Sequence, residues 1–219
     1  MKLNNGLDEI NTALTNVILS EYVYGKKMLL TLSGGMDTRL ILSIMFKHGI
    51  KPDLMTWDGS PKDIKIACAI SKRYRLKHII IRRKTDDPGW KKAVNDVIKN
   101  YDIIFYGELM SEVFNKFVRF TESERKLNGL ITNFYAWVEK NVDKEKCNKV
   151  MPCLDGKVME ATEKLPICFR VYGYINRRLI QYNYPELLCI PHTVVNLRYR
   201  VLECCYWVVV PFIEMYVKY

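Results

Sequence analysis

The apolar positions at the start of the chain change spacing near residue 25. They recur at helical intervals at Leu7, Ile10, Leu14, Val17 and Ile18. This spacing predicts an amphipathic opening helix that ends near Gly25. A short continuous apolar run, Met28 to Leu32, follows and stops at two glycines. A run of this kind predicts a strand that is buried on both faces.

Strand and helix patterns then alternate up to about residue 107. Further strands are expected at 53–57, 77–81 and 102–106, and helices at 38–47, 61–74 and 90–99. Strands that alternate with helices across short loops indicate a parallel sheet covered by helices. We therefore predict an α/β fold with a doubly wound parallel five-stranded sheet flanked by helices.

The strand signal fades after residue 107, and the remaining patterns are helical. They cover 109–120, 127–140, 156–164 and 171–182. We expect one domain over residues 1–219, with a sheet core at about 26–120 and a helical C-terminal elaboration at about 121–219. Glu203, Pro211 and Glu214 interrupt the most apolar segment, 201–217. Carboxylates are costly within a membrane, so we predict a buried terminal helix or strand there and no transmembrane segment.

Composition narrows the class of protein. The chain has 219 residues, of which 49% are hydrophobic and 26% charged, as in a folded protein rather than a disordered one. Its first residues lack the apolar run of a signal peptide, and its seven cysteines are an odd, scattered set. We therefore expect reduced thiols and a cytoplasmic protein.

The net charge of +10 is concentrated in one stretch. Residues 61–100 contain twelve Lys and Arg against four Asp and Glu, which gives +8 of the total. Most of the excess therefore belongs to the segment Lys62 to Lys99. This stretch is a candidate docking face for an acidic partner or RNA.

The segment Ser33-Gly34-Gly35-Met36-Asp37-Thr38 lies between a predicted buried strand and a predicted helix. Its glycines allow a tight turn, and backbone amides converge at the start of a helix, where partial positive charge favours a phosphate. No Lys follows the glycines, so this is not the loop of a kinase or GTPase. Asp37 offers one carboxylate, which suits a magnesium ion held mainly by phosphate oxygens and water.

This segment resembles the pyrophosphate loop of the ATP pyrophosphatases, the PP-loop enzymes that cleave ATP between its α and β phosphates. The run from Leu32 to Leu42 is similar to the asparagine synthetase branch. Further collinear similarities to that branch are Met55-Thr56-Trp57-Asp58-Gly59-Ser60-Pro61 with Asp63 and Ala67, Lys77-His78, Tyr106-Gly107-Glu108-Leu109-Met110-Ser111-Glu112-Val113-Phe114, and Met151-Pro152-Cys153-Leu154-Asp155 with Leu165-Pro166. The resemblance runs from about Leu7 to Pro191.

The resemblance implies a set of binding residues for ATP and Mg²⁺. The expected nucleotide-binding residues are Leu32, Ser33, Gly34, Gly35, Asp37, Thr38, Trp57, Tyr106 and Gly107. The phosphates would lie on 33–38 and the adenine near Leu32 and Trp57. Glu108 would orient the incoming amine or take up its proton. The implied substrates are a small carboxylate such as aspartate and an amine or ammonia, the latter from a separate ammonia source.

Departures from the family pattern define the remaining candidates. Ser111 stands where the family has a second magnesium-binding Asp, and Glu112 is a candidate substitute, so the metal candidates are Asp37 and Glu112. The family's catalytic lysine has no clear counterpart. Arg198 and Arg200 are candidates for its role, with 177–178 as alternatives. Residue 2 is Lys, and the family's cysteine-nucleophile glutaminase half does not fit in 219 residues, so glutamine hydrolysis is not expected.

Three functions therefore stay open. The leading one is an ATP-dependent, amide-forming carbon–nitrogen ligase of asparagine synthetase type. The second is an RNA-modifying ATP pyrophosphatase, which the basic stretch 61–100 favours. The third is a non-catalytic relative that binds a nucleotide, which Ser111 and the missing lysine favour.

Overall fold

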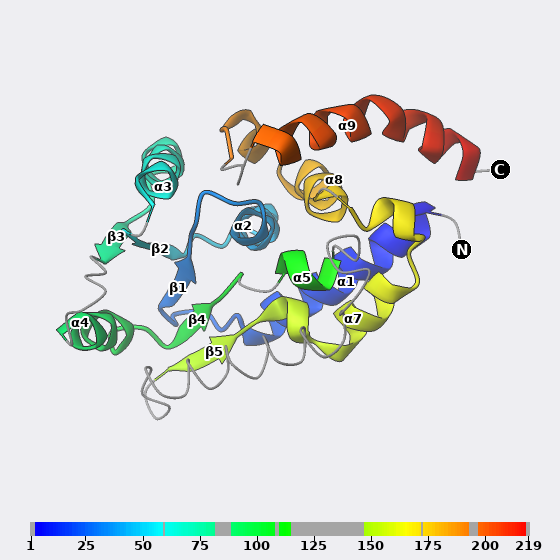
Figure 1. The fold of residues 1–219 in the computed structure, drawn as a ribbon. Helices are drawn as coiled ribbons and strands as arrows, with labels where there is room; N and C mark the ends of the chain where they lie inside the picture. Colours follow the sequence, from blue (N-terminus) through cyan, green and yellow to red (C-terminus); the bar gives the residue numbers. More distant parts are fainter. Residues whose placement is uncertain are drawn as a thin grey trace.

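The computed structural model describes residues 3–58, 60–81, 89–107, 110–114, 147–171, 173–192 and 197–217 (Figure 1). Its α-helices are α1 (Leu3–Glu21), α2 (Asp37–Lys47), α3 (Pro61–Tyr74), α4 (Gly89–Ile98), α5 (Met110–Phe114), α7 (Gly156–Glu163), α8 (Tyr174–Asn183) and α9 (Leu197–Val217). The strands are β1 (Met28–Thr31), β2 (Asp53–Trp57), β3 (His78–Ile81), β4 (Ile103–Phe105) and β5 (Asn148–Val150). Short 3₁₀ turns are η2 (Pro152–Leu154), η3 (Ile167–Phe169) and η4 (Pro185–Cys189).

The five strands form one parallel sheet in the order β3-β2-β1-β4-β5. Leu30 of β1 is in register with Leu54 of β2 on one side and Phe105 of β4 on the other. The chain first builds outward from β1 through β2 to β3, then returns to the opposite side of β1 with β4. The predicted doubly wound α/β fold is confirmed, and the strand order reverses between β1 and β4.

Two buried clusters cover the two faces of the sheet. One contains Leu30 and Phe105 with side chains from α1, α2, α3, α7 and α8. The other contains Leu29 and Ile104 with side chains from α4. Neighbours in a strand point to opposite faces, so the side chains on both faces of β1 and β4 are buried and nearly all apolar. The apolar stretches at 28–32, which Thr31 interrupts, and 103–106 are therefore the mark of a two-sided sheet.

Local signals set the bounds of β2 and α3, which agree with the prediction. Ser60 is the N-cap of α3, and its hydroxyl accepts a hydrogen bond from the Asp63 amide at 3.3 Å. Pro61 occupies the first turn, and Arg75 ends the helix in the left-handed conformation with φ of 55°. Both ends of α3 thus carry ordinary capping chemistry.

The fifth strand lies outside the expected sheet core of about 26–120. Strand β5 consists of Asn148, Lys149 and Val150 at the edge of the sheet, and among the described strands it pairs with β4 alone. Three residues with a single apolar member have no strand pattern of their own. Pairing with β4, not the local sequence, therefore makes this segment a strand, and the predicted boundary between the sheet and the helical part was wrong.

Helix α9 differs from the predicted buried terminal element. It lies on the far side of α8 from the sheet (Figure 1), and only part of its surface is covered. Its outward face is apolar, with Val201, Val208, Val209, Phe212 and Met215 exposed by 50–71%. The segment is helical, but the prediction of burial was wrong. No helix in the described ranges is long and apolar enough to cross a membrane.

Candidate functional site

The glycine-rich segment lies where the strand order reverses. It leaves β1 after Thr31 and enters α2 at Asp37, beside the end of β4. Parallel doubly wound sheets bind ligands at this position, outside the carboxyl ends of the strands. A Cβ at Gly107 would lie 2.9 Å from the Thr38 Cα and amide nitrogen. The backbone after β4 therefore approaches the start of α2 as closely as only glycine allows.

Backbone amides of the loop donate three of the hydrogen bonds that shape it. The Ser33 amide donates to the Thr38 hydroxyl at 3.2 Å, and the Gly35 amide donates to the Ser33 hydroxyl at 3.2 Å. The Gly34 amide donates to the Asp63 carboxylate at 3.0 Å, which ties the loop to α3. The N-cap residue of α2, Met36, makes no side-chain capping hydrogen bond. The first-turn amides of α2, which have no carbonyl partner within the helix, therefore supply partial positive charge at the strand ends.

Asp37, the predicted magnesium ligand, is held by a residue that the sequence did not indicate. The Asn176 side-chain amide of α8 donates a hydrogen bond to Asp37 Oδ1 at 2.5 Å. Asn176 is buried, and its Oδ1 has no hydrogen-bond partner among the described residues. A buried amide oxygen without a partner is costly. A polar residue on the buried side of an amphipathic helix was the one available signal for Asn176, but nothing in the sequence related it to Asp37.

A small cavity of about 130 Å³ opens beside the loop. Its walls are Thr31, Leu32, Ser33, Thr38, Thr56, Trp57, Ser60 and Asp63. The Thr56 hydroxyl donates to the Leu32 carbonyl at 2.6 Å, and His78 Nε2 lies 2.9 Å from the same hydroxyl. Burial lowers the pKa of His78, so the ring is neutral at pH 7 and supports the wall without adding charge.

The structure brings most predicted nucleotide-binding residues together. Leu32, Ser33, Thr38 and Trp57 line the cavity, Gly34 and Gly35 form the loop, and Gly107 abuts Thr38. Tyr106 is the exception, because its side chain is buried in the core on the α4 face of the sheet. Glu108 lies outside the described residues. Glu112 is on α5, but the structure does not describe its side chain.

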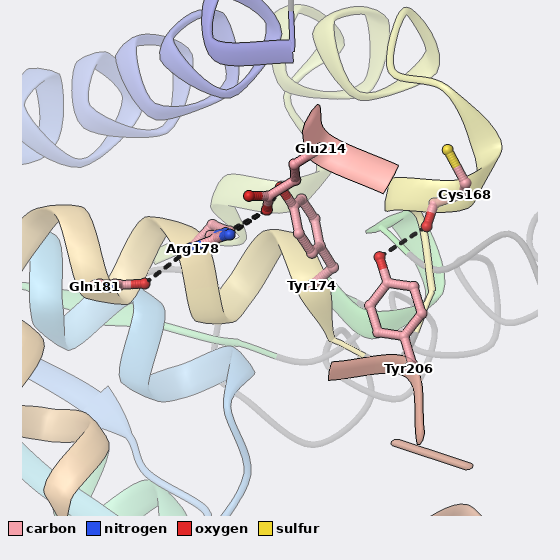
Figure 2. A network of polar contacts seen from close by, with 6 residues as sticks. All are labelled: Cys168, Tyr174, Arg178, Gln181, Tyr206 and Glu214. Carbon is pink, nitrogen blue, oxygen red and sulfur yellow. Dashed lines mark hydrogen bonds and ion pairs between the residues drawn. The ribbon is translucent and has the colours of Figure 1, made fainter. Parts of the chain in front are cut away.

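The basic candidates are divided between two helices. Arg198 and Arg200 are in the first turns of α9, where the structure does not describe their side chains. The alternatives both contact α9 from α8. Arg178 is paired with Glu214, as Figure 2 shows, and the Arg177 guanidinium lies 4.7 Å from the centre of the Trp207 ring. Arg177 and Arg178 therefore hold α9 in place, and nothing described directs them towards the loop.

Among the described residues, the Asp37 carboxylate is the candidate metal ligand at the site. No group of three or more His, Cys, Asp or Glu that could hold a metal ion occurs among the described residues. Asp37 beside the α2 N-terminus still fits Mg²⁺, because this ion often takes one or two carboxylates and completes its coordination with phosphates and water.

The basic stretch occupies the β3 edge of the sheet, as its position in the sequence suggested. On α3, five basic side chains are exposed: Lys62, Lys65, Lys72, Arg73 and Arg75. Asp63, the acidic residue among them, instead contacts Gly34. The exposed surface of α3 is therefore strongly positive and begins next to the loop.

Comparison with known proteins adds no information to the fold and the loop geometry. No protein-family model matches the chain, and the search of curated proteins gives no match.

Proposed function

We propose that the protein is an ATP-dependent synthetase of asparagine synthetase type. It adenylates a small carboxylate such as aspartate, releases pyrophosphate, and passes the activated acyl group to ammonia or an amine. The proposal rests above all on one arrangement. Asp37, oriented by the buried Asn176, stands at the N-terminus of α2, where the strand order of the sheet reverses.

The chain offers a separate place for each part of ATP. The phosphates would lie against the first-turn amides of α2, which favour anions. The adenine would lie by the cavity that Leu32 and Trp57 line. A volume of about 130 Å³ accommodates a small ring system or several waters at about 30 Å³ each. Mg²⁺ would be held by Asp37 and would neutralise phosphate charge.

The reaction needs alignment and charge stabilisation more than proton chemistry. A substrate carboxylate oxygen forms a bond to the α-phosphorus, and the bond from that phosphorus to the bridging oxygen breaks as pyrophosphate leaves. The amine then forms a bond to the acyl carbon and AMP leaves, while the amine loses a proton. By the resemblance, Glu108 would accept that proton, and Arg198 or Arg200 would stabilise the leaving pyrophosphate. A site of this kind works mainly by positioning and by fixed positive charge.

The test is release of pyrophosphate from MgATP that depends on a carboxylate, with aspartate and ammonium as the first pair. We expect Asp37→Asn to lower the rate by about 100-fold or more, because metal-assisted charge stabilisation is worth several kcal/mol. Asp96→Asn is the matched control, since Asp96 is exposed on α4 and pairs with Lys99. Absence of nucleotide binding, or release and binding unchanged by Asp37→Asn, would contradict the proposal.

A second variant tests the positioning of Asp37. Asn176→Leu keeps the volume but removes the hydrogen bond, and we expect about a tenfold rise in the Mg²⁺ concentration for half-maximal activity. Asn183→Leu is the control, because Asn183 is also buried on α8 but bonds to Asn11 and the Leu179 carbonyl. If the two variants shift the Mg²⁺ dependence equally, Asn176 has no special role.

The exposed basic surface of α3 favours an alternative, an ATP pyrophosphatase that activates an RNA base. Five Lys and Arg side chains beginning next to the loop would meet a phosphate backbone well. Pyrophosphate release stimulated by tRNA rather than by a small carboxylate, with steeply salt-dependent tRNA affinity, would select it. Tight ATP binding without release under either condition would indicate a non-catalytic relative.

A further inference from the structure

Arg39 is a fully buried cation directly behind the glycine-rich loop. Its side chain has 0% exposure. Its guanidinium donates to four backbone carbonyls, those of Gly34 at 3.2 Å, Leu187 at 3.3 Å, Ile190 at 2.5 Å and Pro191 at 2.5 Å. One charged group therefore joins the loop to the segment 187–191, which is remote in sequence.

No described carboxylate pairs with Arg39, so its charge has no counter-ion among the residues that the structure describes. Burial alone lowers its pKa, to about 10, and the side chain is still charged at pH 7. Arg178 differs, because it is paired with the Glu214 carboxylate. Buried charges are normally paired, since an unpaired one is costly even when carbonyl dipoles surround it.

The position of this charge indicates which anion it serves. Arg39 Nη2 bonds to the Gly34 carbonyl, so the guanidinium lies immediately beneath the loop. That bond turns the carbonyl of Gly34 inward, and the N-cap residue of α2, Met36, makes no side-chain capping hydrogen bond. The loop also has no lysine, the residue that supplies positive charge in many other phosphate loops.

We propose that Arg39 is the fixed positive charge of the phosphate site, acting from behind the loop without touching the ligand. It is a positioning residue as well, because its hydrogen bonds keep the Gly34 carbonyl away from the phosphates. This inference rests on the proposed binding of ATP at the loop. It also predicts a preference for highly charged ligands, since a buried positive charge favours a ligand in proportion to the negative charge of that ligand.

The test compares ligands of increasing charge by calorimetric titration: adenosine, AMP, ATP and inorganic pyrophosphate. Coulomb coupling to a buried charge that does not touch the ligand is worth about threefold in affinity for each added charge. We expect Arg39→Met to weaken pyrophosphate and ATP by about 100-fold and AMP by about tenfold, and to change adenosine by less than twofold. Arg39→Lys keeps the charge, so it should retain most of the preference for ATP over adenosine even if its affinities fall.

Arg170→Met is the matched control. Arg170 is also a buried arginine, but its guanidinium donates to the Val113 carbonyl of α5 rather than to a carbonyl of the loop. We expect its ligand series to follow that of the wild type.

Three outcomes would overturn the inference. Equal weakening of all four ligands by Arg39→Met would show a purely structural role. Loss of the ATP preference in Arg39→Lys would show that charge is not the reason, and this variant decides the question if Arg39→Met does not fold. Wild-type protein that binds neither ATP nor pyrophosphate would overturn the proposed function and, with it, this inference.

Discussion

The two sides of α8 hold their polar groups in opposite ways. On the side of the loop, Asn176 holds Asp37, its own Oδ1 has no partner among the described residues, and the described hydrogen bonds of the Arg39 side chain all go to carbonyls. On the side of α9, Tyr174 and Arg178 share the Glu214 carboxylate, with the Tyr174 hydroxyl 2.6 Å from Glu214 Oε1 (Figure 2). The described residues on the loop side thus leave the charge of Arg39 without a counter-ion. On the side of α9, Arg178 and Glu214 neutralise each other.

The difference separates a binding region from a structural contact. Unneutralised buried charge costs stability, so a chain that retains it next to a helix N-terminus has a use for an anion there. Opposite charges that neutralise each other hold two helices together, here beside a cavity of about 440 Å³ that Tyr174, Arg178 and Glu214 help to line. Tyr206 adds to the α9 contact, because its hydroxyl donates to the Cys168 carbonyl at 2.8 Å (Figure 2).

The largest effect is expected from a substitution beside the glycine-rich loop. Gly107→Ala would place a methyl group 2.9 Å from the Thr38 backbone and 2.5 Å from its Cγ2, so β4 and α2 must separate. We expect a loss of about 1–3 kcal/mol in the free energy of unfolding, as for other overpacked sites, together with loss of ATP binding. Urea denaturation and calorimetry measure the two effects.

Gly156→Ala is the control for this change. A Cβ at Gly156 meets nothing within 4 Å, and the residue begins α7. Its stability should be unchanged or higher, because alanine restricts the unfolded chain. Equal losses in the two variants would mean that the approach of Gly107 to Thr38 does not matter.

A smaller effect is expected from breaking the α9 side. Glu214→Gln removes the charge from the contact with Arg178 but keeps an acceptor for Tyr174. Because the pair is partly exposed, we expect a loss of about 1 kcal/mol in the free energy of unfolding. Hydrogen exchange in α9 should rise, while ATP affinity stays at the wild-type value. A fall in ATP affinity matching that of Gly107→Ala would remove the distinction between the two sides.

The smallest expected effect is a pH dependence of the free energy of unfolding that comes from His78, beside the loop. Burial lowers the pKa of His78 below its ordinary value near 6.5, so unfolded His78 takes up a proton at a higher pH than folded His78. Stability from this residue is therefore complete above pH 6.5 and falls as the pH decreases towards the folded pKa. Tyr174 and Tyr206 have raised pKa values through burial and stay protonated over this range.

Urea denaturation between pH 7.5 and 5.5 measures this dependence. His78→Gln should flatten it, whereas a variant of the exposed His48, His48→Gln, should retain the wild-type slope. A slope that His78→Gln leaves unchanged would assign the pH dependence to other groups.

The predictions from sequence succeeded where local chemistry was sufficient. Strand β2 and helix α3 have their predicted bounds, because a short, mostly apolar run, a serine cap and a proline in the first turn are all local signals. The loop was placed correctly between β1 and α2 for the same reason. The predictions failed at β5 and at the exposed face of α9, whose environments depend on distant neighbours.

The sequence by itself determined the α/β class, the position of the glycine-rich loop and the candidate carboxylate at Asp37. Only the tertiary structure decided what surrounds them. In the sequence, Arg39 is an ordinary helical residue and Asn176 is one polar position among others. Folding buries Arg39 behind the loop and brings Asn176 to Asp37. The physical reason is that periodicity reports which face of an element is buried, whereas the partner that a buried polar group meets depends on how separate elements pack.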